Sequence, residues 1–428
     1  MPTSARKVVV ARTVLTAEAA PSPSRTGAPV RVLAKVGEAS LKGRNRRRFL
    51  DVLRRNLKAA LARLDARIET GGSVLVIAVH DELAADEVAS RLERVFGFAA
   101  ASVCLRCERD PERIADVAMI AFERQRPETF AVRVRRRDKT FPLTSQDLER
   151  QIGAAIQQRT GLPVDLGAPG LELRVEVDEE AAYVHVRELE TGGGLPVGTS
   201  GRALSLLSGG IDSPVASLLA MKRGLSVDFV HFSGEPYLEP TATAKAQAQA
   251  KVLNGFQAER PGALWVVPFG HQQRMLSAVS DESHRIVLYR RQMARIGCAL
   301  AEGLRASALV TGDSLGQVSS QTLPNMSAVE DACELPILRP LLAFDKREVM
   351  AEAAAIGILA LSELPADDAC PLFAGAKQRT AVPRAAILEA EAQLDLDELA
   401  RSAAGTARKE EPGVFLDRLE RESRAKSR

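Results

Sequence analysis

Residues 208–213 read Ser-Gly-Gly-Ile-Asp-Ser and directly follow the apolar run 203–207. This order predicts a buried strand that passes through a glycine turn into a helix starting near Pro214. Paired glycines let backbone N–H groups approach phosphate oxygens, and the start of the helix adds its positive dipole end. Ser208 and Ser213 offer hydroxyl donors, whereas Asp212 would repel phosphate unless a cation such as Mg²⁺ lies between them. The segment therefore predicts a site for a metal-bound nucleotide.

The same segment differs from two common nucleotide motifs. It lacks the Gly-Lys-Ser/Thr ending of a Walker A loop and the Gly-x-Gly-x-x-Gly of a dinucleotide fold. It resembles the PP-loop of the ATP pyrophosphatases, a superfamily that cleaves ATP between its α- and β-phosphates, usually to adenylate a carbonyl or carboxyl oxygen. The alternative is an ordinary glycine-rich turn between a strand and a helix.

Length and composition limit the class of protein. A chain of 428 residues, 46% of them hydrophobic, is expected to form two or three domains with sizeable cores. It contains no run of about 18 uncharged apolar residues, so association with a membrane is not expected. Five cysteines do not make the framework of a disulfide-rich protein, and they favour the reducing cytoplasm as its location.

Positive charge is concentrated in the N-terminal half, although the formal net charge of the whole chain is only +3. Residues 42–58 contain eight basic residues against one acid, and residues 124–139 contain seven against two. The phosphate backbone of a nucleic acid is a natural partner for such clusters. The alternative is a solvated helix face.

The N-terminal half is expected to contain two α/β domains, a ferredoxin-like domain at residues 29–98 and a second one at 99–190. The expected strands are 30–36, 73–79, 129–136, 172–177 and 182–187, and the expected helices are 47–64, 86–95, 111–125 and 145–159. Residues 1–28 are expected to form a disordered extension.

The C-terminal half predicts a doubly wound parallel sheet. Glycine-rich residues 191–201 form the expected linker, and strands alternate with helices within 202–405. In such sheets the ligand binds beyond the carboxyl ends of the strands, which is where residues 208–213 are expected. Residues 406–428 are expected to form a charged tail.

Motifs in several parts of the chain, in one consistent order, point to a single family. Residues 36–46 read Val-Gly-Glu-Ala-Ser-Leu-Lys-Gly-Arg-Asn-Arg, and 138–145 read Asp-Lys-Thr-Phe-Pro-Leu-Thr-Ser. Residues 311–322 read Thr-Gly-Asp-Ser-Leu-Gly-Gln-Val-Ser-Ser-Gln-Thr, and Leu-Arg-Pro-Leu at 338–341 is followed by Asp345-Lys346. With the PP-loop, these motifs resemble the ThiI family of tRNA 4-thiouridine synthetases. The resemblance implies an α/β chain with a ferredoxin-like domain, an RNA-binding THUMP domain and a PP-loop ATP pyrophosphatase domain.

The resemblance also implies an activity. ATP would adenylate O4 of uridine 8 in tRNA, and a persulfide sulfur would then displace the activated oxygen to form 4-thiouridine. A cysteine desulfurase or another persulfide donor would supply the sulfur, and the family also feeds sulfur to thiamine thiazole synthesis. Homodimers are common among such relatives. Two alternatives remain, namely another PP-loop RNA-modifying enzyme (a cytidine thiolase or a lysidine-type ligase) and a non-catalytic RNA-binding THUMP protein.

The resemblance assigns binding residues by position. The residues expected to bind ATP are Leu206, Leu207, Ser208, Gly209, Gly210, Asp212, Ser213, His231, Phe232, Arg290, Gly312 and Gln321. Those expected to bind RNA are Lys42, Arg44, Arg46, Arg133, Arg135, Arg137 and Lys139. His231 fits a core histidine as well as an ATP ligand. Of the adjacent Arg290 and Arg291, only Arg290 is expected to point inward. No protein metal site is predicted beyond the Mg²⁺ that accompanies ATP.

Asp212, Lys346 and Cys370 are the expected catalytic residues, with Cys370 as the persulfide carrier. The family carries its reactive cysteine in a Glu-Asp-Cys segment, but here Ala369 follows Asp368 and the cysteine comes one place later. Cys370 therefore aligns with the second of two adjacent cysteines found in many relatives. No rhodanese-like domain is expected to deliver sulfur, so either another protein supplies the persulfide or the enzyme uses sulfide differently.

The other cysteines leave alternatives open. Cys298 and Cys333 are candidates for a resolving thiol, or for iron–sulfur ligands together with Cys370, but the catalytic domain lacks the Cys-x-x-Cys of cluster-dependent relatives. Cys104 and Cys107 form a lone Cys-x-x-Cys, which without a second pair predicts incidental cysteines rather than a zinc site.

Overall fold

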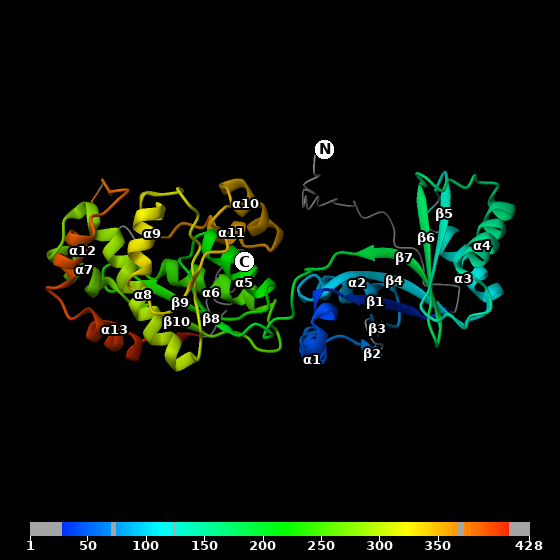
Figure 1. Ribbon diagram of the computed structural model, residues 1–428, viewed down its shortest axis with the longest axis horizontal. Helices are drawn as coiled ribbons and strands as arrows, with labels where there is room; N and C mark the ends of the chain where they lie inside the picture. The colour runs from blue at the N-terminus through cyan, green and yellow to red at the C-terminus, as the bar shows by residue number, and fades with distance from the viewer. Residues whose placement is uncertain are drawn as a thin grey trace, which may run out of the picture. The chain divides into compact units, whose positions relative to one another are not determined.

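The chain folds into two compact units that divide after Leu195 (Figure 1). The computed structural model describes residues 28–69, 74–123, 125, 127–366, 372–375 and 377–410. The expected N-terminal extension lies outside the described residues except for Ala28, and Cys370 and residues 411–428 lie outside them as well. Among the described residues, no helix has both the length and the apolar character needed to cross a membrane.

The first unit is built on a seven-stranded sheet with the order β2-β3-β1-β4-β7-β6-β5. All neighbouring strands are antiparallel except the parallel pair of β5 and β6. The strands are β1 (Val30–Val36), β2 (Arg67–Glu69), β3 (Val74–Ala78), β4 (Phe98–Cys107), β5 (Phe130–Arg136), β6 (Leu171–Val177) and β7 (Ala182–Leu189). The helices are α1 (Arg46–Ala60), α2 (Glu82–Leu92), α3 (Pro111–Glu123) and α4 (Ser145–Thr160).

Strand β4 joins the two domains expected in this unit, because it pairs with β1 along one edge and with β7 along the other. The boundary expected between residues 98 and 99 falls at its first residue. The local sequence does not predict this strand, since the run Phe98-Ala-Ala-Ala is rich in alanine, which is depleted in strands. Pairing on both edges determines its conformation.

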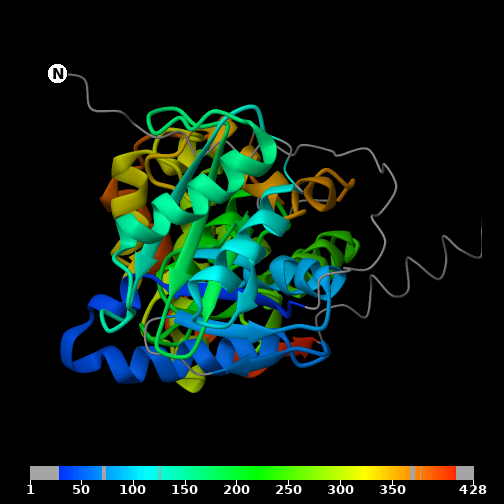
Figure 2. The same cartoon turned by 90° about the vertical axis from the view of Figure 1, so that its right-hand side faces the viewer.

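Helices α3 and α4 lie side by side at the β5–β6–β7 end of the sheet (Figures 1 and 2). Thr144 begins α4 with a capping box, in which its hydroxyl oxygen accepts from the Asp147 N–H while the Asp147 carboxylate accepts from the Thr144 N–H. Gly161 ends the helix at φ +71°, a conformation that glycine adopts without steric cost.

The second unit contains a six-stranded sheet with the order β12-β11-β8-β9-β10-β13. Its strands are β8 (Arg202–Leu206), β9 (Ser226–Ser233), β10 (Leu264–Pro268), β11 (Leu309–Val310), β12 (Ile337–Leu338) and β13 (Arg408–Glu410), and all pairs except β10 with β13 are parallel. The helices are α5 (Asp212–Lys222), α6 (Thr241–Asn254), α7 (Gly270–Ala278), α8 (Arg285–Leu304), α9 (Leu323–Glu330), α10 (Lys346–Ala355), α11 (Leu359–Ser362), α12 (Arg384–Glu391) and α13 (Leu396–Gly405).

The strand order changes direction at β8, which makes its carboxyl end the switch point of a doubly wound sheet. Successive side chains of a strand point to opposite faces. Leu204 joins the apolar cluster that contains the core residues of α8, whereas Ser205 Oγ lies 2.8 Å from Ser217 Oγ of α5. Helices α5 and α8 therefore cover opposite faces of β8, as this fold class requires.

The expectation of a charged tail from residue 406 onward is wrong for Arg408–Glu410, because these residues form β13 along the edge of the sheet. Trp265 of β10 pairs with Lys409, and Arg408 forms an ion pair with Glu235 at 2.9 Å. Charged side chains are typical of edge strands, because they discourage pairing with a further strand. A charged composition therefore did not distinguish this strand from a tail.

Candidate functional site

The loop between β8 and α5 closes on itself through its serine side chains. The Ser208 N–H donates to Ser213 Oγ at 3.0 Å, and the Gly210 N–H donates to Ser208 Oγ at 3.3 Å. Gly209 has φ +89°, which a residue with a Cβ rarely adopts. Ser208 and Gly210 are exposed, so the loop presents backbone to a ligand at the N-terminus of α5.

Side chains of helix α6 hold this loop in place through hydrogen bonds. The Gln249 side chain is fully buried, and its Nε2 donates to the carbonyl oxygens of Gly209 at 2.9 Å and Gly210 at 3.0 Å. The same Nε2 lies 3.1 Å from Ser362 Oγ at the end of α11. One turn earlier in α6, Lys245 Nζ donates to the carbonyl oxygens of Ser362 and Leu364, both at 2.7 Å. The loop and the end of α11 are thus held on one helix.

Gly312, which follows β11, approaches the loop so closely that no side chain fits. A Cβ at this position would lie 2.6 Å from the Ser213 backbone nitrogen and 2.7 Å from the Asp212 carbonyl carbon. The structure therefore brings two separate predicted segments, 208–213 and 312–321, together at the carboxyl end of the sheet.

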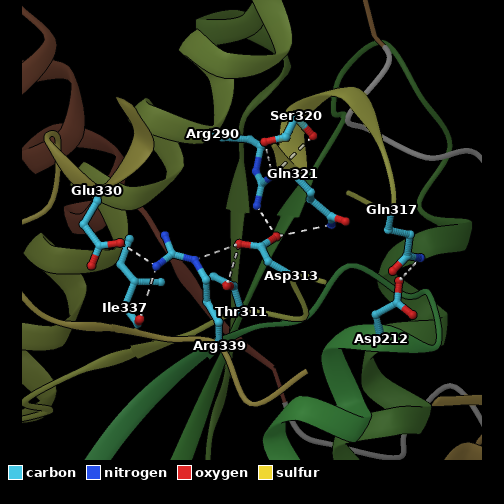
Figure 3. A network of polar contacts seen from close by, with 10 residues as sticks. All are labelled: Asp212, Arg290, Thr311, Asp313, Gln317, Ser320, Gln321, Glu330, Ile337 and Arg339. Atoms are coloured by element: carbon cyan, nitrogen blue, oxygen red, sulfur yellow. Dashed lines mark hydrogen bonds and ion pairs between the residues drawn. The ribbon is translucent and has the colours of Figure 1, made fainter. Parts of the chain in front are cut away.

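Asp313 is the centre of a polar network next to Gly312 (Figure 3). Its Oδ1 accepts hydrogen bonds from Arg290 and from Gln321 Nε2 at 3.3 Å, and its Oδ2 accepts from Thr311 Oγ1 at 2.8 Å. Arg339 Nε lies 3.4 Å from Oδ2. Burial alone would raise the pKa of Asp313, but the Arg290 charge and the hydrogen bonds from Thr311 and Arg290 outweigh it, so the pKa is lowered.

Asp212 and Lys346, both expected to be catalytic, lie next to each other. Lys346 Nζ is 3.7 Å from Asp212 Oδ1, and Gln317 Nε2 donates to Oδ2 at 3.2 Å. Lys346 is the first residue of α10, whose start is fixed by a capping box between Asp345 and Glu348. Both side chains remain reachable, with Asp212 26% and Lys346 54% exposed.

His231 and Phe232 are in the core of this structure. His231 is 2% exposed, and its Nδ1 lies 2.8 Å from the carbonyl oxygen of Leu207. Phe232 packs edge-on against Phe269 with ring centroids 5.5 Å apart. Leu206, at the end of β8, is half-buried, and Leu207 is buried. Contact of these side chains with ATP remains a prediction.

The expectation that only one of two adjacent arginines points inward is wrong. Arg290 joins the Asp313 network, but Arg291 is also buried, with its side chain 5% exposed. Arg291 donates to Glu391 from Nε at 2.6 Å and from Nη2 at 2.8 Å, and Arg295 donates to the same carboxylate. A helix can bury two neighbouring arginines when its packing partners on both sides provide acceptors, and here α12 provides Glu391.

Three family profiles match the chain. The profile described as "Thiamine biosynthesis protein (ThiI)" matches residues 198–396, the THUMP domain profile matches 109–187, and the ThiI ferredoxin-like domain profile matches 31–102. A probable tRNA sulfurtransferase of Nocardia farcinica is 42% identical over 379 residues, which is 87% of this chain and 92% of that protein. The chain belongs to the ThiI family.

Other members and a solved structure agree with this. A probable tRNA sulfurtransferase of Thermus thermophilus is 41% identical over 362 residues, covering 85% of this chain and 89% of that protein. A crystal structure of a 4-thiouridine synthetase–RNA complex with bound ATP superposes with a TM-score of 0.82 at 31% identity, covering 89% of this chain and 99% of that one. The ThiI resemblance and the fold class inferred from the sequence are both confirmed.

The basic residues expected to bind RNA in this ThiI chain differ in their surroundings. Arg44, Arg46, Arg135 and Lys139 are exposed. Lys42 Nζ lies 5.7 Å from the centre of the Phe49 ring, and Arg133 Nη2 donates to the Leu166 carbonyl oxygen at 2.8 Å. All six side chains reach the surface of the first unit, although Lys42 and Arg133 are only half-exposed.

Arg137 differs from the other six because its charge is engaged inside the unit. It forms an ion pair with Glu176, whose side chain is 5% exposed and also binds Lys35. Burial alone would raise the pKa of Glu176, but hydrogen bonds from His185 and Lys35 and the Arg137 charge hold it well below its usual range. Arg137 therefore neutralises a buried carboxylate, and sequence spacing gave no sign of this.

The segment expected to carry the ThiI persulfide cysteine is anchored on both described sides. Leu364 is held by Lys245, and the Phe373 carbonyl oxygen accepts from Arg285 Nη1 at 2.7 Å. The Phe373 ring packs against Tyr237 at 5.2 Å between centroids. Among the described residues, no group of three or more His, Cys, Asp and Glu side chains is placed to hold a metal ion.

Sequence reasoning missed Gln249, Lys245, Asp313 and Arg339. Asp313 lies inside the motif at 311–322, and Arg339 lies inside 338–341, so those motifs held the available signal. No local pattern marks Gln249 or Lys245, because their partners are more than 30 residues away in sequence.

Proposed function

We propose that this chain is an ATP-dependent tRNA uracil 4-sulfurtransferase that forms 4-thiouridine at position 8. The observation that carries the proposal is the closed loop at the switch point, with Gly312 packed against it and Asp212 beside Lys346 at its opening. Its similarity over most of its length to tRNA sulfurtransferases and to an ATP-bound 4-thiouridine synthetase–RNA complex supports the same activity.

ATP binding would use the loop backbone. The start of α5 would face the polyphosphate, and exposed Ser208 adds a hydroxyl donor, while the N–H groups of Ser208 and Gly210 hold the loop closed. Mg²⁺ fits Asp212, because its Oδ1 accepts no hydrogen bond from the described residues. When bound, this ion would neutralise phosphate charge. Asp313 is unsuited to that role, since two arginines already bind its carboxylate.

In the first half-reaction, uridine O4 attacks the α-phosphorus and pyrophosphate leaves. The half-exposed Lys346 side chain, whose Nζ lies beside Asp212, is placed to stabilise charge that develops on the phosphates. In the second half-reaction, the terminal sulfur of a persulfide on Cys370 attacks C4 of the ring. The C4–O4 bond breaks and AMP leaves with the oxygen.

The sulfur must then leave Cys370. A thiolate of the sulfur donor or of a reductant attacks Cys370 Sγ, forms a disulfide with it, and releases the thiolated uridine. A cysteine desulfurase is the proposed donor of the persulfide. Because Ala369 occupies the position next to Asp368, the choice of Cys370 is tested separately below.

The remaining parts of the proposal follow from family membership and composition. The domain limits are 29–98, 99–190 and 202–405, with RNA bound by the first two and ATP by the third. The cytoplasm is the proposed location, because the five cysteines favour a reducing compartment. We also propose that the chain forms a homodimer and has a second role in thiamine thiazole synthesis.

Mass spectrometry of nucleosides tests the activity. Unmodified tRNA is incubated with the full chain, Mg-ATP and either sulfide or a cysteine desulfurase with cysteine. We expect 4-thiouridine with both sulfur sources, and none with Asp212→Asn. Cys370→Ser should lose product with the desulfurase and keep it with sulfide.

Three results would contradict parts of this proposal. If tRNA and ATP bind but neither sulfur source gives product, the chain is a non-catalytic RNA-binding protein. Lysidine or a thiolated cytidine would identify another PP-loop enzyme. Unchanged 4-thiouridine from Cys370→Ser with the desulfurase would exclude Cys370 as the carrier but leave the activity intact.

A further inference from the structure

Two cysteines far apart in sequence meet in the second unit. Cys298 lies in α8 and Cys333 follows α9, 35 residues later, yet their Sγ atoms are 2.9 Å apart. Both side chains are partly exposed, so a small reagent can reach them. Neither residue takes part in the loop, in the Asp313 network or in the proposed sulfur transfer.

The surroundings of the pair favour one thiolate and one thiol. The hydrogen bond from Cys333, together with backbone N–H groups of Leu335 and Glu334, lowers the pKa of Cys298 to about 6, although burial opposes this. The interaction with Cys298 and burial raise the pKa of Cys333, whose Sγ lies 3.2 Å from the Leu335 carbonyl oxygen. The nearby carboxylates of Glu334 and Glu330 act against ionisation of Cys298 and Cys333, respectively.

The other described cysteines provide a contrast within the same chain. Cys104 is fully buried, and burial raises its pKa well above the usual value. Burial also raises the pKa of Cys107 to about 11. The two lie in one strand of the first unit and make no sulfur–sulfur contact among the described atoms. A reagent that requires a thiolate should therefore distinguish the Cys298–Cys333 pair from them.

We propose that Cys298 and Cys333 form a redox-active dithiol that a low-molecular-weight disulfide converts into an intramolecular disulfide. The Cys298 thiolate attacks one sulfur of the reagent RSSR, which gives a mixed disulfide and releases RS⁻. Cys333 then gives up its proton and attacks Cys298 Sγ, which closes the protein disulfide and releases the second RS⁻. The two thiols lose two electrons and two protons in total, and RSSR becomes two RSH.

The position of the pair gives this disulfide a structural consequence. Cys298 lies two turns beyond Arg290 in α8, and Cys333 lies six residues before Arg339. Arg290 and Arg339 both bind Asp313, so the disulfide would covalently join the two segments that carry these arginines. Closing a loop of 35 residues restricts the unfolded chain, so the oxidised second unit should melt at a higher temperature.

Oxidised glutathione is the probe for the test. The reduced full-length protein is incubated with it, the remaining thiols are blocked, and peptides are analysed without reduction. We expect a crosslinked peptide that contains Cys298 and Cys333, and a thiol count lower by two. Cys333→Ser should instead accumulate glutathione on Cys298, whereas Cys298→Ser should leave Cys333 reduced. A Cys104→Ser, Cys107→Ser double variant is the control and should form the same crosslink as the wild type.

Two outcomes would overturn the proposal. One is that Cys298 and Cys333 stay reduced at glutathione disulfide concentrations that modify Cys107. The other is that the crosslink joins Cys298 or Cys333 to Cys370. A second readout does not depend on any variant, since the melting temperature of the wild-type protein should rise on oxidation and return on reduction. An unchanged melting temperature in the crosslinked protein would show that the disulfide does not stabilise the second unit.

Discussion

Asp313 binds two arginines in the interior of the second unit, so its charge should matter for stability. Asp313→Asn keeps the size of the side chain but leaves Arg290 and Arg339 without their shared carboxylate. We expect a loss of about 3 kcal/mol in the free energy of unfolding, the cost typical of breaking a buried ion pair. The single tryptophan, Trp265, lies in β10, so its fluorescence during urea unfolding reports on this unit alone.

Glu398→Gln is the matched control for this substitution, because it also removes one carboxylate from an arginine pair. Glu398 and Arg401 are both 64% exposed. An exposed pair contributes little, so the change should stay below about 0.5 kcal/mol. Equal effects of the two substitutions would show that burial of Asp313 adds nothing.

The lowered pKa of Asp313 predicts a specific pH dependence. A carboxyl group whose pKa is lower in the folded state stabilises the fold fully above its unfolded pKa, near 3.9, and this contribution is lost as the pH falls through the folded pKa. The difference in unfolding free energy between wild type and Asp313→Asn should therefore be constant from pH 7 to 5 and shrink below about pH 4. Trp265 fluorescence at each pH measures it. A difference that persists undiminished at pH 3 would contradict the assignment.

At the scale of elements, Gly312 lets the segment after β11 approach the start of α5. In Gly312→Ala the new Cβ would lie 2.6 Å from the Ser213 nitrogen, so one backbone must move. We expect a loss of about 1–3 kcal/mol in unfolding free energy, and an ATP affinity lower by about tenfold or more, as a cost of 1.4 kcal/mol in binding gives. Calorimetry with Mg-ATP and Trp265 fluorescence measure the two effects.

Gly303→Ala in α8 is the control for this glycine, since a Cβ there meets nothing within 4 Å. Alanine is favoured over glycine inside a helix by about 0.5–1 kcal/mol, so this variant should be as stable as the wild type or more so. It should bind ATP with unchanged affinity. Normal ATP affinity in Gly312→Ala would show that the approach of the two segments does not shape the nucleotide site.

Helix α6 is expected to position the loop through Gln249. Gln249→Ala removes the hydrogen bonds to the Gly209 and Gly210 carbonyl oxygens, each of which contributes about 0.5–1.5 kcal/mol. We expect ATP affinity to fall by about tenfold, because an unsupported loop must be ordered by the ligand. Gln247→Ala on the same helix loses a 3.4 Å contact with Glu410, which is not part of the loop, and should bind ATP normally. Equal affinities of the two variants would exclude a positioning role for Gln249.

At the scale of the whole molecule, local patterns were enough to predict that strands β8 to β11 of the second unit alternate with helices, but not to predict the short strands β12 and β13. The apolar runs that form β8, β9 and β10 are short and separated by helical segments, so their length and their flanking residues reveal them. Strand β4 has three alanines after its first residue and β13 consists of charged residues, and both depend on pairing with distant strands. Their conformation is therefore set by tertiary contacts that no local window contains.

The candidate site likewise combines residues that the sequence alone reveals with residues that only the fold brings together. Residues 208–213 are contiguous, so the sequence alone reveals their chemistry. The neighbours that shape it come from separate segments, as Gln249 lies 40 residues from Gly209 and Arg290 lies 23 residues from Asp313. The buried pairing of Arg137 with Glu176 was hidden for the same reason, since 39 residues separate them.

The two compact units are expected to separate RNA binding from ATP binding. Replacing exposed Arg44, Arg46 and Arg135 with alanine removes charge from the first unit only. Each lost phosphate contact should reduce the slope of log affinity for tRNA against log salt by roughly one, and ATP affinity should stay unchanged. Titrations of labelled tRNA at several salt concentrations measure the slope, and calorimetry measures ATP binding.

Two further variants make this prediction specific. Arg401→Ala removes an exposed arginine from the second unit and should leave the salt slope unchanged, so it controls for net charge. Arg137→Ala should behave differently from the triple variant, because it leaves buried Glu176 without one of its cations and so destabilises the first unit. If the slope falls for Arg137→Ala with no loss of stability, Arg137 contacts phosphate directly and its pairing with Glu176 is dispensable. If it falls equally for Arg401→Ala, the tRNA responds to total charge and the first unit has no special role in binding it.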